Sequence, residues 1–242
     1  MQLNQQFNVD IPQLQRKLYG LDGQFMLSVG DFLLEKQTAA AFCTMQLAAA
    51  KAGLDLQLCS AYRPFDRQVH IWNAKAKGER TLLNNASQPI DFALLTNQQL
   101  IDAILIWSAL PGASRHHWGT DIDVFDAKQI NKQSLQLISA EYQPTGPCFA
   151  LHQWLIQHAN TYGFYFPYQA QQSGVSPEPW HLSYYPVADQ YLSQFRTDEL
   201  TKVLSVAEIT LQSSLLERLT ELVNHYVFFV APSPAQCLRE LT

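Results

Sequence analysis

The 242-residue sequence contains few charged residues, only 15% of the total, and its 21 acidic side chains outnumber its 16 basic ones. With a formal net charge of -5 it has no general attraction for nucleic acid or anionic lipid, so a basic nucleic-acid-binding protein is disfavoured. The longest apolar candidate, residues 226–231, is far shorter than the ~18 residues that a membrane-spanning helix needs. We therefore expect a soluble protein without a membrane span.

A secretory signal and paired cysteines are also missing. Residues 1–18 lack the positive region, apolar run and small-residue cleavage site of a signal peptide, so we expect a cytoplasmic protein, with export by another route as the alternative. The four cysteines form no Cys-x-x-Cys pair, which disfavours a thiolate zinc site and a dense disulfide framework. We expect buried free thiols at Cys43, Cys59, Cys148 and Cys237.

What the sequence does contain is enough apolar material for a well-filled core, with 47% hydrophobic and 12% aromatic residues. No internal repeat or linker-like cluster is visible, so one continuous domain is expected. Residue spacing and helix-stopping Gly or Pro predict helices over 36–52, 64–78, 97–110 and 149–162. β-Forming segments predict strands over 54–58, 122–125 and 180–187, and residues 80–95 are poorly patterned, as in a loop.

The chain changes character near its C-terminus, where an apolar stripe recurs at spacings of three and four residues. The stripe consists of Leu211, Leu215, Leu219, Leu222 and Tyr226. It predicts a long amphipathic helix that packs against the core, with a dimer seam as the alternative. We interpret residues 1–195 as the main domain and residues 196–242 as a C-terminal helical extension packed on it, and the oligomeric state stays open.

Three separate segments, residues 60–63, 114–123 and 178–181, concentrate groups that a hydrolytic metal site needs. A catalytic zinc takes three protein ligands and leaves a fourth position open, and His116, Asp123 and His181 could supply that set. A turn at Gly119 would let the first two converge. Glu178, three residues before His181, is the candidate general base that takes a proton from the attacking water and returns it to the leaving amine.

Two residues beside these segments leave alternatives open. Arg63 is a planar cation that could clamp a substrate carboxylate or stabilise the oxyanion formed during peptide hydrolysis. His117 could be the metal ligand in place of His116, although adjacent residues in an extended segment point to opposite faces. The remaining histidines are interpreted as surface or hydrogen-bonded core residues; they are His70, His152, His158 and His225.

At these residues the sequence resembles the VanY-type D-alanyl-D-alanine carboxypeptidases of the LAS group of zinc peptidases, which includes a domain of sonic hedgehog. The family pattern is Tyr-Arg, then Ser-x-His-x-x-Gly-x-Ala-x-Asp, then Glu-x-Trp-His. The resemblance covers roughly residues 35–187 and selects His116 over His117. The matching positions are Tyr62, Arg63, Ser114, His116, Gly119, Asp123, Glu178, Trp180 and His181.

The resemblance implies an α+β fold in which a small, mainly antiparallel sheet carries a zinc site and helices pack to one side. It makes His116, Asp123 and His181 the ligands of Zn²⁺ and Glu178 the catalytic base. It also gives Arg63 a role in catalysis and substrate binding. The further substrate contacts that it implies are Gln68, Ser114 and Trp180.

This sequence departs from the family pattern at two places. Asp121 stands where the pattern has Ala, on the same face as Asp123 if that stretch is a strand. Asp121 could support a ligand from behind or compete as a ligand itself. After the last motif, residues 182–184 provide none of the positive charge that related enzymes often carry near the next Tyr.

The expected function is a zinc carboxypeptidase that removes the terminal D-alanine from peptidoglycan stem peptides, muropeptides or dipeptides, with D,D or L,D specificity. One alternative is a non-catalytic, metal-containing module that binds such peptides, as in the hedgehog-like branch. The other is an iron(II) oxygenase, which also uses two His and one carboxylate. Oxygenases are disfavoured because their first His and acid are separated by one residue, whereas six separate His116 from Asp123.

Overall fold

The central element of the computed structural model, which describes residues 9–239, is an antiparallel sheet of four strands in the order β3-β6-β8-β7. Two further sheets are two-stranded, β1-β2 and β4-β5. The strands are β1 (Met26–Val29), β2 (Phe32–Glu35), β3 (Leu56–Ser60), β4 (Leu82–Leu83), β5 (Pro89–Ile90), β6 (Asp121–Asp126), β7 (Phe164–Tyr165) and β8 (His181–Tyr184). The fold is α+β, as the sequence predicts.

Helices surround this sheet. The α-helices are α1 (Lys36–Lys51), α2 (Phe65–Ala76), α3 (Asn97–Leu105), α4 (Phe149–His158), α5 (Tyr185–Gln194), α6 (Thr197–Ser205), α7 (Gln212–Val223) and α8 (Pro234–Arg239). The 3-10 helices are η1 (Gln13–Tyr19), η2 (Phe92–Leu94), η3 (Arg115–Trp118), η4 (Ser139–Tyr142) and η5 (Ala159–Tyr162), and η6 (Asn224–Phe228) is a π-helix. Within residues 9–239, none of these helices combines the length and apolar character required to span a bilayer.

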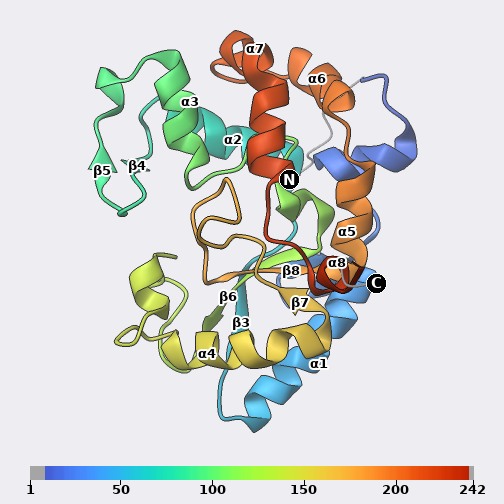
Figure 1. Ribbon diagram of the computed structural model, residues 1–242, viewed down its shortest axis with the longest axis vertical. Helices are drawn as coiled ribbons and strands as arrows, with labels where there is room; N and C mark the ends of the chain where they lie inside the picture. Colours follow the sequence, from blue (N-terminus) through green and yellow to red (C-terminus); the bar gives the residue numbers. More distant parts are fainter. Residues whose placement is uncertain (1–8, 240–242) are drawn as a thin grey trace.

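One face of the sheet packs on α1 and α4, which lie together below it in Figure 1. Because side chains alternate along a strand, β6 turns Ile122 and Val124 toward these helices and Asp121 and Asp123 toward the opposite face. Each fully buried aliphatic side chain contributes about 1.5–3 kcal/mol. The other members of this core include Phe42, Met45, Leu151, Leu155 and Leu182. Strand β6 therefore supplies both the core and a row of buried carboxylates.

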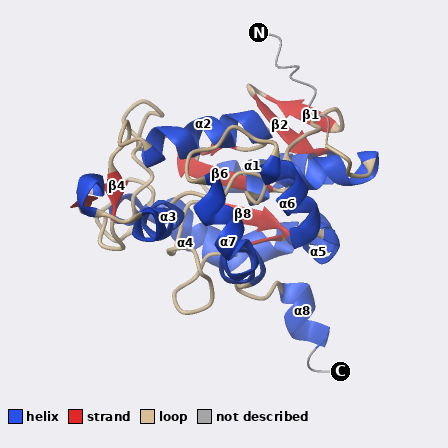
Figure 2. Ribbon diagram, turned by 90° about the horizontal axis from the view of Figure 1, so that it is seen from above, coloured by secondary structure: helices blue, strands red, loops and turns tan. Residues whose placement is uncertain are grey.

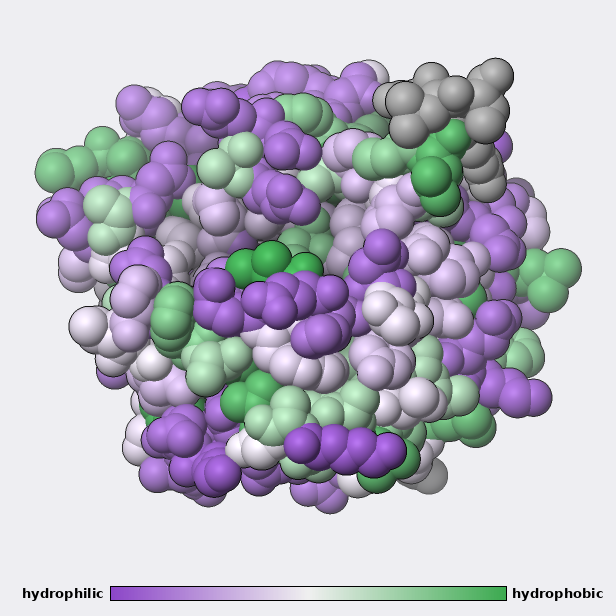
Figure 3. Space-filling view, turned by 60° about the horizontal axis from the view of Figure 1, so that its bottom comes forward, coloured by the Kyte–Doolittle hydropathy of each residue, from purple (hydrophilic) through white to green (hydrophobic). Residues whose placement is uncertain are grey.

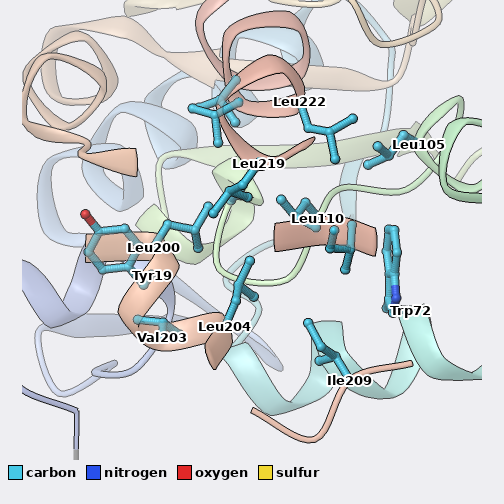
Figure 4. Packing of buried hydrophobic residues seen from close by; sticks show 14 of the residues in the cluster. Tyr19, Trp72, Leu105, Leu110, Leu200, Val203, Leu204, Ile209, Leu219 and Leu222 are labelled. Carbon is cyan, nitrogen blue, oxygen red and sulfur yellow. The ribbon is translucent and has the colours of Figure 1, made fainter. Parts of the chain in front are cut away.

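A second core lies at the other end of the molecule, among α2, α3, α6 and α7. Figure 4 shows its leucines, with Leu200 and Leu204 of α6 and Leu219 and Leu222 of α7 directed toward the same interior. Trp72 of α2 packs there too, and its indole N–H donates to the carbonyl of Thr210 at 2.9 Å. The predicted packing of the apolar stripe is thus confirmed.

Figure 2 looks down on this end of the molecule, where α7 lies beside α3, whereas α8 stands apart from α2 and α3. A C-terminal helical region is therefore confirmed. The boundary between a main domain, residues 1–195, and an extension, residues 196–242, stays a prediction. The first eight residues of the domain and the last three of the extension, 240–242, lie outside the described residues. On the face shown in Figure 3, hydrophobic side chains occur in small groups among hydrophilic ones.

Several local predictions need correction. The predicted loop 80–95 contains the β4-β5 pair and η2. The predicted strand 180–187 ends at Tyr184, because Pro186 in the first turn suits the start of a helix and α5 begins there. All four cysteines are free, as predicted, but of the four only Cys148 is buried; Cys59 is half-buried, and Cys43 and Cys237 are exposed.

Candidate active site

Strands β6 and β8 pair so that Asp123 lies opposite His181 and Asp121 lies opposite Ser183. Side chains directly opposite each other on one face of an antiparallel pair have their Cβ atoms about 5 Å apart. The pairing therefore fixes an acid beside an imidazole before any other element contributes. His181 Nδ1 lies 3.1 Å from Asp123 Oδ1.

His116 reaches the same place from the 3-10 turn η3. The turn ends at Gly119, whose φ of 67° is in the left-handed region that favours glycine. A Cβ at Gly119 would also come within 2.8 Å of the backbone nitrogen of Glu35. This turn brings His116 Nε2 to 3.3 Å from Asp123 Oδ2, the convergence that the sequence predicts.

The three side chains offer one ligand atom each within 4.8 Å of one another, and each is no more than 5% exposed. His116 Nδ1 lies 3.1 Å from the carbonyl of Asp121, so it carries the proton and Nε2 keeps its lone pair. His181 Nε2 donates to the Asp121 carboxylate at 2.9 Å, so Nδ1 is the ring nitrogen that faces Asp123 and is placed to bind a metal. Asp123 Oδ1 is buried and has no hydrogen-bond partner within residues 9–239. These free lone pairs fit the nitrogen and oxygen donors that zinc takes.

Glu178 comes from the loop before β8 and places Oε2 3.4 Å from His181 Nδ1. Burial, assisted by the negative charge of Asp123, raises the pKa of Glu178 to about 7, although His181, Arg63 and Lys75 oppose the shift. A carboxyl group with a pKa near neutrality can accept a proton and return it during one reaction cycle.

Arg63 is held in place by two neighbours. Its guanidinium donates to Gln68 Oε1 at 3.0 Å and to Ser60 Oγ at 3.0 Å. Gln68 is fully buried and uses its amide nitrogen to bond the carbonyl of Ala109 at 2.6 Å. Gln68 thus holds the Arg63 guanidinium, and its predicted contact with substrate stays a prediction. Arg63 itself lines the cavity that contains His116 and Glu178.

His117 turns away from this cavity. Its Nδ1–H donates to the carbonyl of Arg63 at 2.6 Å, and its Nε2 accepts from the backbone N–H of Gly112 at 3.1 Å. Both ring nitrogens are thus used to hold the backbone behind the site. The structure brings His116, and not its neighbour, to Asp123 and His181.

The neutral state of His117 leads to a prediction about acid stability. Burial lowers its pKa to about 3 from an ordinary value of 6.5. As the pH falls below 6.5 the unfolded chain binds a proton that the folded chain excludes, so this residue lowers the free energy of unfolding by about 1.4 kcal/mol per pH unit. Urea titrations of chelator-treated protein at several pH values from about 6.5 to about 5 give the free energy of unfolding at each pH. This free energy should fall less steeply with decreasing pH in His117→Asn than in wild type.

The control for this measurement is Leu110→Ala, which also removes a buried side chain but introduces no change in titratable groups. It should lower stability and keep the wild-type dependence on pH. Equal slopes for wild type and His117→Asn would contradict the assignment of a buried neutral imidazole.

Asp121 shares the face of Asp123, as expected for a strand, but lies behind His181. Its Oδ1 also accepts from Arg115 Nε at 2.8 Å, and its Oδ2 accepts from Thr120 and Ser183 at 2.7 and 3.0 Å. Both oxygens are thus engaged on the far side of the imidazole. The arrangement favours support of a ligand over competition as a ligand.

The site opens into a cavity of about 300 Å³. Ser114 and Trp180 line it, and the Trp180 ring stacks on Trp107 with centroids 6.2 Å apart. Sequence reasoning missed Trp107 and Tyr168, which also line the cavity; the Tyr168 ring lies 4.6 Å from that of His181. Tyr168 lies in an irregular loop, where the sequence has no periodic pattern from which a cavity-lining residue could be predicted. A larger cavity of about 1020 Å³ adjoins this one and shares Trp107, Tyr168 and Glu178 with it.

Two imidazoles and a carboxylate around one point, with a second carboxylate beside them in a cavity, fit the site of a zinc hydrolase. A family model described as VanY, D-alanyl-D-alanine carboxypeptidase, matches residues 31–187. The chain therefore belongs to the VanY family, and it is a zinc metallopeptidase with carboxypeptidase activity.

Other similarities agree with this family. The chain is 35% identical over 121 residues to an uncharacterized protein of Haemophilus influenzae, covering 49% of this chain and 92% of that protein. It is 28% identical over 156 residues to the putative carboxypeptidase YodJ of Bacillus subtilis, covering 62% of this chain and 46% of that protein. The solved structure of VanYB in complex with D-alanine-D-alanine has the same fold, with a TM-score of 0.51 and 19% identity over 75% of this chain and 91% of that one.

Proposed function

We propose that this enzyme removes the terminal D-alanine from peptidoglycan stem peptides or related muropeptides and dipeptides. The observation that carries the proposal is the buried group of His116, Asp123 and His181 with Glu178 beside it in one cavity. The family description and the similarity to a structure that holds D-alanine-D-alanine support the choice of substrate.

In this proposal His116, through Nε2, His181, through Nδ1, and the carboxylate of Asp123 would hold the zinc ion. When bound, the metal supplies Lewis acidity to the scissile carbonyl and lowers the pKa of water. Glu178 removes a proton from the attacking water and delivers it to the nitrogen of the departing amino acid. Its raised pKa suits both transfers.

The remaining groups of the cavity bind and orient the peptide. Arg63 supplies the positive charge that a terminal carboxylate or a developing oxyanion requires. Ser60 and Gln68 hold its guanidinium, so little side-chain freedom is lost when substrate binds. Ser114 and Trp180 form the adjoining wall. Arg63 is half-buried; desolvation lowers the pKa of its guanidinium, and the negative charges of Asp123 and Glu178 oppose that shift.

The test combines a metal measurement with an activity measurement. Elemental analysis of freshly purified protein should give about one zinc per chain, and D-alanine should be released from stem tetrapeptide or pentapeptide in a chelator-sensitive reaction. The preferred peptide distinguishes L,D from D,D cleavage. Zinc without release would contradict hydrolysis and favour a binding module, and a failure to bind zinc after reconstitution would overturn the ligand assignment.

A further inference from the structure

Asp121 is the most heavily bonded charged side chain beside the metal ligands, and the proposed chemistry gives it no direct part. It is completely buried, and its two oxygens accept from four different side chains. Those donors are Arg115 Nε at 2.8 Å, His181 Nε2 at 2.9 Å, Thr120 Oγ1 at 2.7 Å and Ser183 Oγ at 3.0 Å. A buried carboxylate is costly unless it is paired in this way, so the arrangement requires an explanation.

Arg115 holds the Asp121 carboxylate in place. Its side chain is 2% exposed, and besides its ion pair with Asp121 it donates to Ser183 Oγ at 2.7 Å. Ser183 connects the two charged groups, because it accepts from Arg115 and donates to Asp121. The cluster therefore presents a fixed negative oxygen to His181.

A carboxylate can only accept a hydrogen bond, so the nitrogen of His181 that contacts Asp121 must carry the proton. That nitrogen is Nε2, and the bond turns Nδ1 toward Asp123 and Glu178, at 3.1 and 3.4 Å. The bond fixes the rotation of the ring as well as the tautomer. A histidine that donates its other N–H to a carboxylate is also a more basic metal ligand.

The register of the sheet places this support where it can act. Asp121 faces Ser183 across the β6-β8 pair, and Asp123 faces His181 one step further along. His181 therefore lies between two carboxylates of the same strand, with one on each ring nitrogen. We propose that Asp121, held by Arg115, Thr120 and Ser183, is a positioning residue that sets the orientation and tautomer of His181 as a metal ligand.

This inference rests on the proposed role of His181 and is tested by metal release. The zinc-loaded protein is mixed with excess chelator, and release of zinc is followed over time. Asp121→Ala and Asp121→Asn should release zinc about 10- to 100-fold faster than wild type if the about 10- to 100-fold loss of metal affinity typical of removing such support appears in the dissociation rate. The matched control is Asp126→Asn, a buried Asp on β6 whose bonds go to the backbone of Asp55 and Lys128.

A second readout addresses the imidazole itself. Nitrogen-15 NMR of the zinc-loaded protein should show His181 with its proton on Nε2 in wild type and in the Asp126→Asn control, and altered Nε2 shifts in both Asp121 variants. Asp121→Asn retains the side-chain shape, so it carries the test if Asp121→Ala fails to fold.

Zinc release at the control rate, with an unchanged His181 signal, would overturn the inference. If wild type binds zinc but releases no D-alanine, the proposed function fails while the positioning role is still decided by these two measurements. If wild type binds no zinc, both fail together.

Discussion

Replacement of Glu178 with Gln is expected to lower kcat by about 10²- to 10⁴-fold, while the protein still binds about one zinc. Gln has nearly the same shape as Glu but cannot take up and return a proton at neutral pH. Glu178 lies beside the group of three ligands and is not a member of it, so metal binding should survive. The measurement is D-alanine release at saturating substrate, together with the zinc content of the same sample.

The control is Glu199→Gln, which changes a carboxyl group on α6 that pairs with Lys202. It should keep both zinc and turnover. Wild-type turnover by Glu178→Gln would show that another group moves the proton, and loss of zinc from this variant would show that Glu178 contributes to metal binding.

Asp123→Asn is expected to remove both zinc and activity. Asp123 contributes the only negative charge among the three ligands and lies within 3.3 Å of an imidazole nitrogen on each side. If each of three ligands supplies about a third of the 10–16 kcal/mol typical of tight zinc sites, its loss weakens zinc binding by about 10³-fold. Elemental analysis after dialysis against a weak chelator measures the effect.

Thermal unfolding gives an independent check of this variant. A chelator should lower the Tm of wild type, because zinc stabilises only the folded chain that it binds, and should leave the Tm of Asp123→Asn unchanged. Asp126→Asn again serves as the matched control and should behave as wild type. A variant at position 123 that retains zinc through dialysis would contradict the ligand assignment.

The metal ligands could be predicted because their chemistry restricts the choice so strongly. Few residue types bind zinc, and the spacing of His116, Gly119 and Asp123 requires a turn followed by a strand, which the structure has as η3 and β6. The helix 36–52 and the strand 122–125 were predictable for a similar reason, since local composition and packing agree there.

Other features depend on contacts that local sequence does not encode. The role of Gln68 is decided by where the Arg63 guanidinium lies, and a sequence cannot supply that position. The role of Asp121 depends on its pairing with Arg115 and on the β6-β8 register. The β1-β2 hairpin was missed because its strands have four residues each, too few to establish an alternating pattern.

The division of β6 into an aliphatic face and a carboxylate face has a consequence for how this enzyme matures. A slip of one residue in the pairing of β6 would place Asp121 and Asp123 in the hydrophobic core against α1 and α4. It would also place Ile122 and Val124 on the face of the sheet that carries the candidate metal site. A sheet with this mispaired strand can therefore neither pack its hydrophobic core nor bring the metal ligands together. A one-residue insertion between Ile122 and Asp123 should therefore yield an insoluble chain rather than a weak enzyme, which the soluble fraction after expression measures.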